Sequence, residues 1–467
     1  MPIALEDLVG LNRTLVHDLP VVDGEATAAR LLANAGGRRL SLAGMHHSQG
    51  GHTAIEDGRV LLTEAMNERI EVDPVARTVT VDAGVTWSEI HRVLMPHRLC
   101  PRVHQSSAHF TVGGSISVNC HGRDPHAGPV STTVRSLTVL CGDGIVRQAS
   151  PVVEPDLFRA VVGGYGSCGL ILSAELGVIP DQSLRQIGER RTLAALADTL
   201  CDLADDKIPA SEVALFYGWL HCVPGAAFYD EALMVKYVPA DPAGAAMTLE
   251  DQPWGLSEMM RAAWSAARTH SGMRARVWQE LLNEFIRNPV CKYRINWMRA
   301  AVDFSSHRDE RRSDILLEYF LPADQDLASR VRHLGQLFAG RGANVLSTTL
   351  RLVRPDTARP FLAYCAGRPM VCMAIDVDIA TVRDAAGRRM PDEAARTWVR
   401  EATAYVLDEG GTYYLPYFGF AGLDVFRRAY SRHGADWQAQ QEAIQTYNPH
   451  KRFWSAFLDQ YLDPQRP

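Results

Sequence analysis

The stretch Ser41-Leu-Ala-Gly-Met-His-His-Ser-Gln-Gly-Gly-His-Thr53 decides how the rest of the chain is interpreted. An apolar lead-in, Arg39–Ala43, runs into small residues, three histidines and a glycine pair. Glycine lets a backbone turn tightly and approach a ligand closely, so that N–H groups can point at phosphate oxygens. A histidine in such a loop can also bond covalently to a cofactor. Taken alone, the stretch is equally well described as a glycine turn with surface histidines.

Two further glycine-rich stretches follow, each attached to an expected strand or helix. The second is Thr111-Val-Gly-Gly-Ser-Ile-Ser-Val-Asn-Cys-His-Gly122, and the third is Gly163-Gly-Tyr-Gly-Ser-Cys-Gly169. Three such loops are hard to explain as turns alone, and they indicate a nucleotide-like cofactor. None of them combines GxGxxG after the first strand with an acidic residue about 20 positions further on, so a Rossmann-type dinucleotide fold is not expected.

The pattern of apolar residues predicts a mixture of helices and strands. Val21–Ala35 predicts a strand edge and an amphipathic helix, and Arg39–Ala43 a short buried strand, which together form a β-α-β unit. The first glycine loop then lies at the carboxyl end of a strand, where α/β sheets place ligands. Further strands are expected at 60–62, 70–73, 78–81, 133–140, 145–146, 170–176, 214–220, 315–321, 344–353 and 370–378, and helices from 84 and at 156–162, 324–338 and 396–407. The Trp-, Met- and Arg-rich segment from about 238 to 312 is expected to be helical and peripheral.

Length and composition narrow the class of protein. A chain of 467 residues is too long for one ordinary core, so two intertwined domains are expected. A net charge of −6 argues against a nucleic-acid partner, and no apolar run reaches the roughly 20 residues that a membrane-spanning helix needs. The nine cysteines are odd in number and lack CxxC spacing, so neither a disulfide framework nor a metal site is indicated, and a cytoplasmic location is expected.

The three glycine stretches carry motifs in a specific order. These are Gly-x-x-His-Ser at residues 44–50, Thr-Val-Gly-Gly ending in His-Gly at residues 111–122, and Asp-Leu-Phe followed by glycines at residues 156–171. In this order they resemble the FAD-binding half of the vanillyl-alcohol oxidase/p-cresol methylhydroxylase (PCMH) superfamily. The similarity is greatest to the branch that holds alditol oxidases, aldonolactone oxidases and decaprenylphosphoryl-ribose oxidase, and it covers about the first 180 residues well.

The resemblance implies an α+β fold in three parts. Residues 1–180 would form a PCMH-type FAD-binding domain of two α+β subdomains. Residues 181–410 would form an α+β cap, or substrate, domain with an antiparallel sheet. Residues 411–467 would return to the active site and the FAD domain.

The resemblance also implies which residues contact FAD. The first loop would hold the pyrophosphate and the ring edge, the second would line the opposite side, and the third would hold the adenosine end. These residues are Gly44, Met45, His46, His47, Ser48, Gln49, Gly50, Thr111, Val112, Gly113, Gly114, Ser117, His121, Gly122, Gly169 and Ile171.

His47 is the residue that the resemblance implies for covalent attachment of FAD. In covalent members of the superfamily the histidine just before the serine is bonded to the flavin, and that position is His47. The alternatives are attachment at the neighbouring His46 and a non-covalently held FAD. Some members have a second, cysteinyl bond two residues before Thr-Val-Gly; here that residue is His109, so a double attachment is not expected.

Four residues are candidates for the chemistry on an alcohol carbon, which needs a base or a cation near the flavin. Alditol oxidases carry Glu-x-Arg on a cap strand, and here the arginine is kept as Arg351 while Thr349 replaces the glutamate. Tyr417 stands where relatives carry a lysine, His121 recurs in relatives near flavin and substrate, and Glu318 is a candidate base. Their alternatives are an exposed strand-end charge for Arg351, sheet packing for Tyr417, a bond within its own loop for His121, and a solvent-facing side chain for Glu318.

The predicted function is an FAD-dependent oxidoreductase that oxidises a CH–OH group of a sugar, polyol, cyclitol or related hydroxylated metabolite. Oxygen or another electron acceptor would reoxidise the flavin. One alternative is a tailoring oxidase of a larger glycosylated or aromatic natural product, and another is a flavoprotein subunit that works with a partner enzyme. Both oxidase and dehydrogenase chemistry, and the oligomeric state, stay open at this stage.

Overall fold

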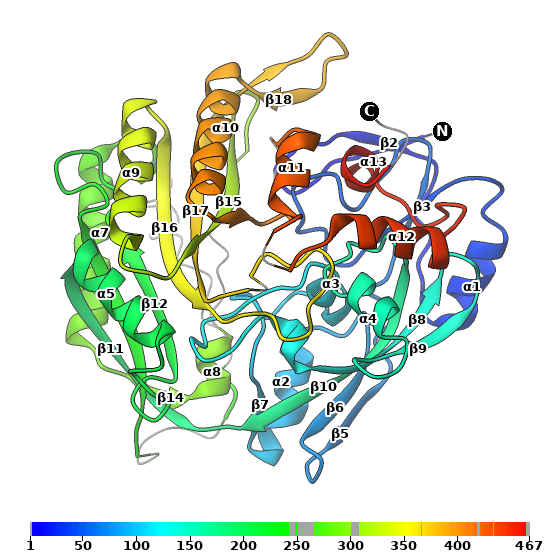
Figure 1. The fold of residues 1–467 in the computed structure, drawn as a ribbon, viewed down its shortest axis with the longest axis horizontal. Coiled ribbons are helices and arrows are strands. Elements are labelled where there is room, and N and C mark those ends of the chain that lie inside the picture. Colours follow the sequence, from blue (N-terminus) through cyan, green and yellow to red (C-terminus); the bar gives the residue numbers. More distant parts are fainter. Residues whose placement is uncertain are drawn as a thin grey trace.

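Two sheets organise the chain in the computed structural model, which describes residues 2–241, 248–250, 266–299, 308–365, 367–417, 421–432 and 434–463. Figure 1 shows a nine-stranded sheet and its helices as one lobe, on the left, and a six-stranded sheet with its surrounding elements as the other. The two chain ends lie close together on the second lobe. The mixed α/β content and the antiparallel sheets agree with the coarse fold class expected from sequence.

The lobe on the right is built from the amino-terminal part of the chain. Its six-stranded antiparallel sheet contains β5 (Ile70–Asp73), β6 (Thr78–Asp82), β10 (Gly169–Pro180), β8 (Val134–Cys141) and β9 (Val146–Ala149), with β7 (Leu99–Pro101) paired to the end of β10. Around it lie β1 (Ile3–Leu5), β2 (Thr14–Val16), α1 (Glu25–Ala33), β3 (Leu40–Ala43), β4 (Arg59–Leu62), α2 (Trp87–Leu94), α3 (Val112–Ser117) and α4 (Pro155–Val161), together with two short 3₁₀ helices, Met95–His97 and Val130–Thr133.

Local sequence signals explain several of these elements. The expected β-α-β unit is present, because β3 runs parallel to β4 beside α1, and Val21 bridges to Leu62. Helix α2 begins with a capping box, in which the Thr86 hydroxyl accepts from the amide of Glu89 and the Glu89 carboxylate accepts from the amide of Thr86. Both features confirm the expectations for these segments.

The second glycine stretch differs from the expected loop, because residues 112–117 form the helix α3. Thr111 caps this helix by accepting a hydrogen bond from the amide of Gly114. A Cβ atom on Gly113 would lie 2.7 Å from the Cβ of Ala83, so glycine is required for α3 to approach the end of β6 this closely. The Gly-Gly pair therefore has a role in helix packing, in addition to any contact with a ligand.

The lobe on the left contains a sheet of nine antiparallel strands. Its order is β14 (Cys291–Tyr293), β11 (Ser183–Thr192), β13 (Glu231–Pro239), β12 (Leu215–Leu220), β16 (Asn344–Val353), β17 (Met370–Arg383), β15 (Arg312–Pro322) and β19 (Thr412–Tyr413), with β18 (Arg389–Pro391) paired to β17. Its helices are α5 (Leu193–Ala204), α7 (Ser271–Arg287), α8 (Arg294–Met298), α9 (Leu327–Gly340) and α10 (Glu393–Asp408).

The register of this sheet separates its two faces. Gly218, Leu350, Met373 and Tyr319 form one row across four strands, and the Tyr319 hydroxyl bonds to α10 through Thr403. That face carries the helices α5, α9 and α10. Side chains one position along each strand point the opposite way, towards the amino-terminal lobe. The opposite face is therefore the one available to a site between the lobes.

The segment 238–312 was expected to be helical. Helices α7 and α8 agree with that expectation, whereas β14 is a strand that extends the sheet next to β11. The parts of this expectation at residues 242–247, 251–265 and 300–307 lie outside the described residues. Within the described ranges, no helix is both long enough and apolar enough to cross a membrane.

The carboxyl-terminal helices α11 (Leu423–Ala429), α12 (Trp437–Tyr447) and α13 (Ala456–Tyr461) lie against the amino-terminal lobe (Figure 1). Phe453 bridges to Leu40 of β3, which places the end of the chain beside the strand that leads into the first glycine loop. Asn448 is fully buried, and its amide nitrogen donates to the carbonyls of Ser167 and Phe453 at 2.8 and 2.7 Å. Its amide oxygen accepts from the backbone of Arg452 at 2.8 Å.

We expect the substitution Asn448→Ala to lower the free energy of unfolding by about 3 kcal/mol, because it leaves several buried backbone groups without partners. Urea denaturation followed by far-UV circular dichroism measures the change. The matched control is Asn34→Ala, which removes one exposed hydrogen bond and should cost about 0.5 kcal/mol or less. Equal losses in the two variants would show that Asn448 does not anchor the carboxyl-terminal segment.

Candidate active site

The structure brings the three glycine stretches together. A Cβ atom on Gly44 would lie 2.5 Å from the Thr111 hydroxyl oxygen, so the first loop and the start of α3 meet nearly backbone to backbone. The amide of Tyr165, in the third stretch, donates to the carbonyl of Ser117 at 3.0 Å. A Cβ atom on Gly166 would lie 3.0 Å from Leu42, in the strand before the first loop. Segments more than 100 residues apart in sequence thus form one glycine-lined region.

The first loop offers backbone donors of the kind that a pyrophosphate needs. Among the described residues, the amide groups of Gly44, Met45 and His46 have no hydrogen-bond acceptor. His46 has a φ of 54°, a left-handed conformation that changes the direction of the chain at this point. The amide of Gln49 is different, because it donates to the carbonyl of Pro416 at 2.8 Å. Free amides at a tight turn can bind anionic oxygens, and these residues therefore fit the diphosphate of FAD.

The other residues implied for FAD contact lie in several environments. His47 is half-buried, with its ring centroid 4.2 Å from that of Phe110. The Gln49 side chain is buried and accepts from the amide of Leu316 in β15, which fixes the loop to the nine-stranded sheet. Val112 and Ile171 belong to the apolar core. Among the remaining residues, Thr111 lies against Gly44 and the Ser117 carbonyl accepts from Tyr165, so these two join the glycine stretches. Ser48 is half-buried, and Gly114 donates its amide to the Thr111 hydroxyl. Four glycines pack against residues outside these stretches or within their own loop: Gly50 against His52, Gly113 against Ala83, Gly122 against His104 and Gly169 against Leu140.

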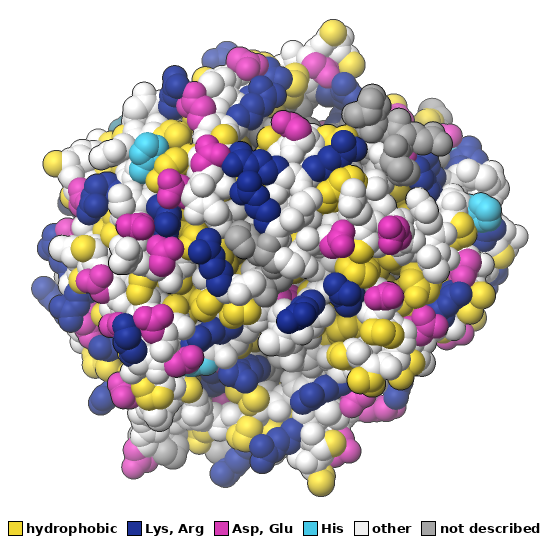
Figure 2. Space-filling model, in the orientation of Figure 1, with side chains coloured by type: hydrophobic (Ala, Val, Ile, Leu, Met, Phe, Trp, Pro, Cys, Tyr) yellow, Lys and Arg dark blue, Asp and Glu magenta, His cyan; other side chains and the backbone are white. Residues whose placement is uncertain are grey.

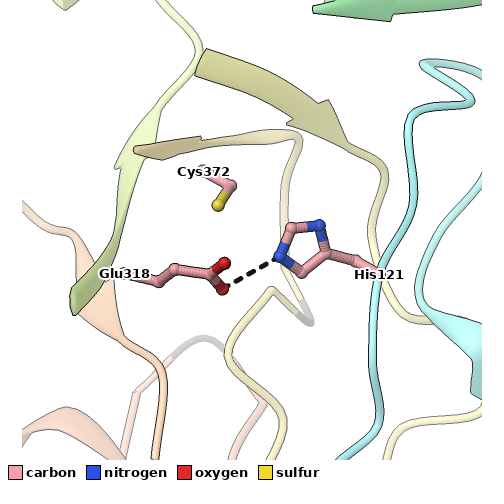
Figure 3. A group of neighbouring side chains, drawn as sticks. All are labelled: His121, Glu318 and Cys372. Carbon is pink, nitrogen blue, oxygen red and sulfur yellow. Dashed lines mark hydrogen bonds and ion pairs between the residues drawn. The ribbon is translucent and has the colours of Figure 1, made fainter. Parts of the chain in front are cut away.

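A buried polar cluster lies where the amino-terminal lobe meets the nine-stranded sheet (Figure 3). His121, from the loop after α3, points its Nε2 at a carboxylate oxygen of Glu318 in β15, at 3.1 Å. These residues are only 4% and 6% exposed. Cys372 of β17 is also buried, and its Sγ lies within 4.8 Å of the nearest ligand atoms of the other two. The Nδ1 atom of His121 is buried and has no partner among the described residues.

This geometry decides between the alternatives for Glu318 and His121. Glu318 does not face solvent, because it points away from the α10 side of the sheet and towards His121. His121 is bonded across the lobes instead of within its own loop. Burial and the nearby Glu318 raise the pKa of the Cys372 thiol well above its usual value, which keeps it protonated and a poor nucleophile. The cluster is therefore best suited to holding and moving a proton.

Arg351 and Tyr417 complete the cluster. Arg351 of β16 pairs directly opposite Cys372 of β17, so both side chains point to the Glu318 side of the sheet. Tyr417 lies within electrostatic reach of Glu318, Cys372 and Arg351. Burial raises the pKa of its phenol well above the usual value. Tyr417 therefore remains a hydrogen-bond donor at ordinary pH. The four predicted catalytic residues lie in one place.

The sheet register also explains how the site has a carboxylate although Thr349 replaces a glutamate. Glu318 pairs with Ala374, and Ala374 pairs with Thr349, so the three residues form one row across β15, β17 and β16. The carboxylate is thus supplied two strands away from Thr349. This relationship depends on strand order, which the periodicity of a single sequence does not contain.

Two aromatic residues beside His121, Phe320 and Tyr364, were missed from the sequence, whereas Tyr414 was a weaker candidate next to Tyr417. Rings of Phe320, Tyr364 and Tyr414 surround its imidazole at centroid distances of 5.5–6.1 Å. The hydroxyls of Tyr364 and Tyr414 donate to the backbone carbonyls of Asn119 and Val118, which fixes the loop that carries His121. The local pattern around Phe320 and Tyr364 is that of ordinary buried strand and loop residues, so no signal in the sequence could have singled out these two.

The His52 ring packs between the first glycine loop and Phe457. It is buried, stacks on Phe457 at 4.1 Å between ring centroids, and lies 5.3 Å from the ring of Tyr165. A Cβ atom on Gly50 would lie 2.7 Å from the His52 ring, so the loop rests directly on it. Burial lowers the pKa of His52 to about 3, and the ring is therefore neutral in the folded protein at ordinary pH.

The comparisons with known proteins agree with this geometry. Residues 23–150 match the FAD binding domain family. The chain is 32% identical over 211 residues to decaprenylphosphoryl-β-D-ribose oxidase of Mycolicibacterium smegmatis, covering 44% of this chain and 46% of the relative. It is 29% identical over 202 residues to L-gulonolactone oxidase of Mus musculus, covering 43% and 45%. It is also 31% identical over 124 residues to alditol oxidase of a Streptomyces species, covering 27% and 29%.

These matches confirm the predicted resemblance and the predicted cofactor. The chain carries an FAD-binding domain of the kind found in these oxidases, and FAD is its cofactor. The matched regions span less than half the length of each of these relatives.

The buried neutral His52 predicts a specific dependence of stability on pH. As the pH falls below 6.5 the unfolded chain takes up a proton at this histidine, whereas the folded chain does so only near pH 3. The free energy of unfolding should therefore decrease as the pH falls through that window. In His52→Gln this free energy should depend less steeply on pH, by the contribution of one proton. Urea unfolding at pH 3.5–7.5 measures this, with the exposed His17→Gln as control. Identical slopes for His52→Gln and the unsubstituted protein would contradict the assignment.

Proposed function

We propose that this protein is an FAD-dependent oxidoreductase that oxidises a CH–OH group of a small hydroxylated metabolite such as a sugar, polyol or cyclitol. The observation that carries the proposal is the buried His121–Glu318 pair, whose free Nδ1 atom lies in the same region as the glycine loops. The proposed substrate class is consistent with the sugar and alditol names of the relatives. Oxygen or another electron acceptor would complete the cycle.

The His121–Glu318 pair is arranged to accept the hydroxyl proton. A carboxylate only accepts hydrogen bonds, so the Nε2 atom of His121 donates to Glu318 and Nδ1 keeps its lone pair. A substrate hydroxyl that reaches Nδ1 can therefore transfer its proton there. The imidazolium that forms is stabilised by the carboxylate of Glu318, which lies 3.1 Å from it in a site with little water.

Bound FAD supplies the acceptor for the hydride that leaves the same carbon. The free amides of Gly44, Met45 and His46 would bind its diphosphate, and His47 would be its point of covalent attachment. Tyr417 would donate to an oxygen of the substrate, since its phenol stays protonated. All nine cysteines are free thiols, a state compatible with the proposed cytoplasmic location.

We expect His121→Gln to slow flavin reduction by a panel of sugars and polyols about 100-fold or more, the usual contribution of a positioned base. Anaerobic stopped-flow absorbance of the flavin band measures the rate, and the bound FAD content is measured in parallel. The control is His126→Gln, a half-buried histidine that bonds to the Val213 carbonyl outside the cluster. A reduction rate within threefold of the unsubstituted protein would remove His121 from the reaction.

Covalent attachment at His47 predicts that flavin remains with the protein after acid precipitation. His47→Ala should release it into the supernatant, whereas His46→Ala should retain it. Flavin fluorescence of pellet and supernatant distinguishes the outcomes. Release from His46→Ala instead would place the bond at His46, and release from the unsubstituted protein would show that FAD is held without a covalent bond.

A further inference from the structure

The Arg351 guanidinium lies in the cluster without a direct ion-pair partner among the described residues. Its Nε atom is buried and has no hydrogen-bond acceptor, and none of its nitrogens makes a hydrogen bond or ion pair with the described residues. The Nε atom of this cation is shielded from water without gaining a hydrogen bond in exchange, which is unfavourable. Such a side chain indicates that the missing partner is a ligand.

Comparison with other arginines shows that a guanidinium with a buried Nε atom and no other contact is unusual among the described residues. Several described arginines also have a buried Nε without an acceptor, but each makes another contact. Arg38 and Arg396 pair with acids, Arg294 pairs with Asp124, Arg368 and Arg389 donate to carbonyls, Arg299 donates to Ser88, and Arg427 stacks on Trp437. On the face drawn in Figure 2, basic and acidic side chains are likewise interspersed.

No acidic side chain among the described residues is paired with Arg351. The nearest carboxylate in the cluster, Glu318, is already bonded to His121. The other groups that face the guanidinium are Cys372, Tyr417 and Tyr217, and burial raises the pKa of all three well above the usual values, so they are neutral. A second cation, Arg123, lies 5.6 Å above the Tyr217 ring, which makes this end of the site more positive.

We propose that Arg351 binds an anionic oxygen group of the substrate, a carboxylate or a phosphate. The substrate of the proposed oxidation is then a hydroxylated acid or a phosphate ester and not a neutral polyol. This inference rests on the proposed function and adds the charge of the substrate to it.

The sheet geometry limits the size of this substrate. Glu318 and Arg351 lie on β15 and β16, with β17 between them, and neighbouring strands are about 4.8 Å apart. Arg351 is also two residues, or about 6.6 Å, along its strand from the position opposite Glu318, so the two backbone positions are about 12 Å apart, and both side chains extend towards the space over Cys372. A molecule of a few carbons can place its hydroxyl at His121 and its anionic group at Arg351.

The test compares matched neutral and anionic compounds on the FAD-loaded protein. The pairs are D-glucitol with D-gluconate and D-ribose with D-ribose 5-phosphate, and inorganic phosphate is added alone to detect binding of a free anion. Flavin difference spectra give dissociation constants without turnover, and anaerobic reduction is recorded separately. The variants are Arg351→Met, Arg351→Lys and, as control, Arg341→Met, which breaks an exposed ion pair with Glu401.

We expect at least one anionic compound to bind about 10- to 100-fold more tightly than its neutral partner, the value of a charge-assisted hydrogen bond. Arg351→Met should abolish this ratio with little change for the neutral compound, Arg351→Lys should keep part of it, and Arg341→Met should leave it unchanged. The carboxylate and phosphate arms identify which anion is preferred.

Two results would overturn the inference. Equal binding of neutral and anionic compounds would show that Arg351 has no anionic partner in the substrate. An equal loss for both classes in Arg351→Met would show that it acts on the hydroxyl or the flavin instead. Either result leaves the proposed oxidation intact if a neutral compound still reduces the flavin. Anion-selective binding without reduction by any compound would instead uphold the anion site and contradict the oxidation.

Discussion

The hydrogen bond between His121 and Glu318 is the contact on which the site depends. Its partners are 197 positions apart in sequence, and each comes from a different lobe. Both are almost fully buried, so while the lobes are packed together each depends on the other, and not on water, for this hydrogen bond. The requirement to pair these two groups fixes how the loop after α3 faces the nine-stranded sheet. The positions of Cys372 and Arg351 then follow from the strand register.

The first glycine loop is also fixed by contacts with distant parts of the chain. The Gln49 side chain accepts from the amide of Leu316 in β15, its amide donates to Pro416, and its carbonyl accepts from Asn12. One loop residue is thus tied to the amino terminus, to the sheet and to the returning segment. The amides of Gly44, Met45 and His46, earlier in the loop, have no acceptor among the described residues, and an anion can bind to them without displacing a described protein contact.

Many helices and strands could be predicted from the sequence because each depends on residues that are close together in the chain. The cap at Thr86, the buried strand at residues 40–43 and the helix near residues 156–162 follow from neighbouring residues alone. The cofactor was predictable because three motifs keep their order along the chain. The helix α3 was missed because its glycines suggested a loop, and the need for close packing on Ala83 is visible only in three dimensions.

The candidate site was predictable only in part. His121, Arg351 and Tyr417 could be proposed from motifs, but the sequence left the direction of Glu318 open because strand alternation does not say which face is buried. Its pairing with His121 depends on the order β16-β17-β15, which joins strands that are not consecutive. The aromatic side chains around His121 come from three separate segments, and only the assembled structure brings them together.

The bridge between Leu40 and Phe453 has a consequence for assembly of the holoprotein. The strand that leads into the first glycine loop pairs with β4 on one edge and gains a bridge on its other edge from a residue more than 400 positions further along the chain. Closing so long a loop costs chain entropy. This edge of the strand is therefore completed only after the residues around Phe453 have been synthesised, later than the segment that matches the FAD binding domain family.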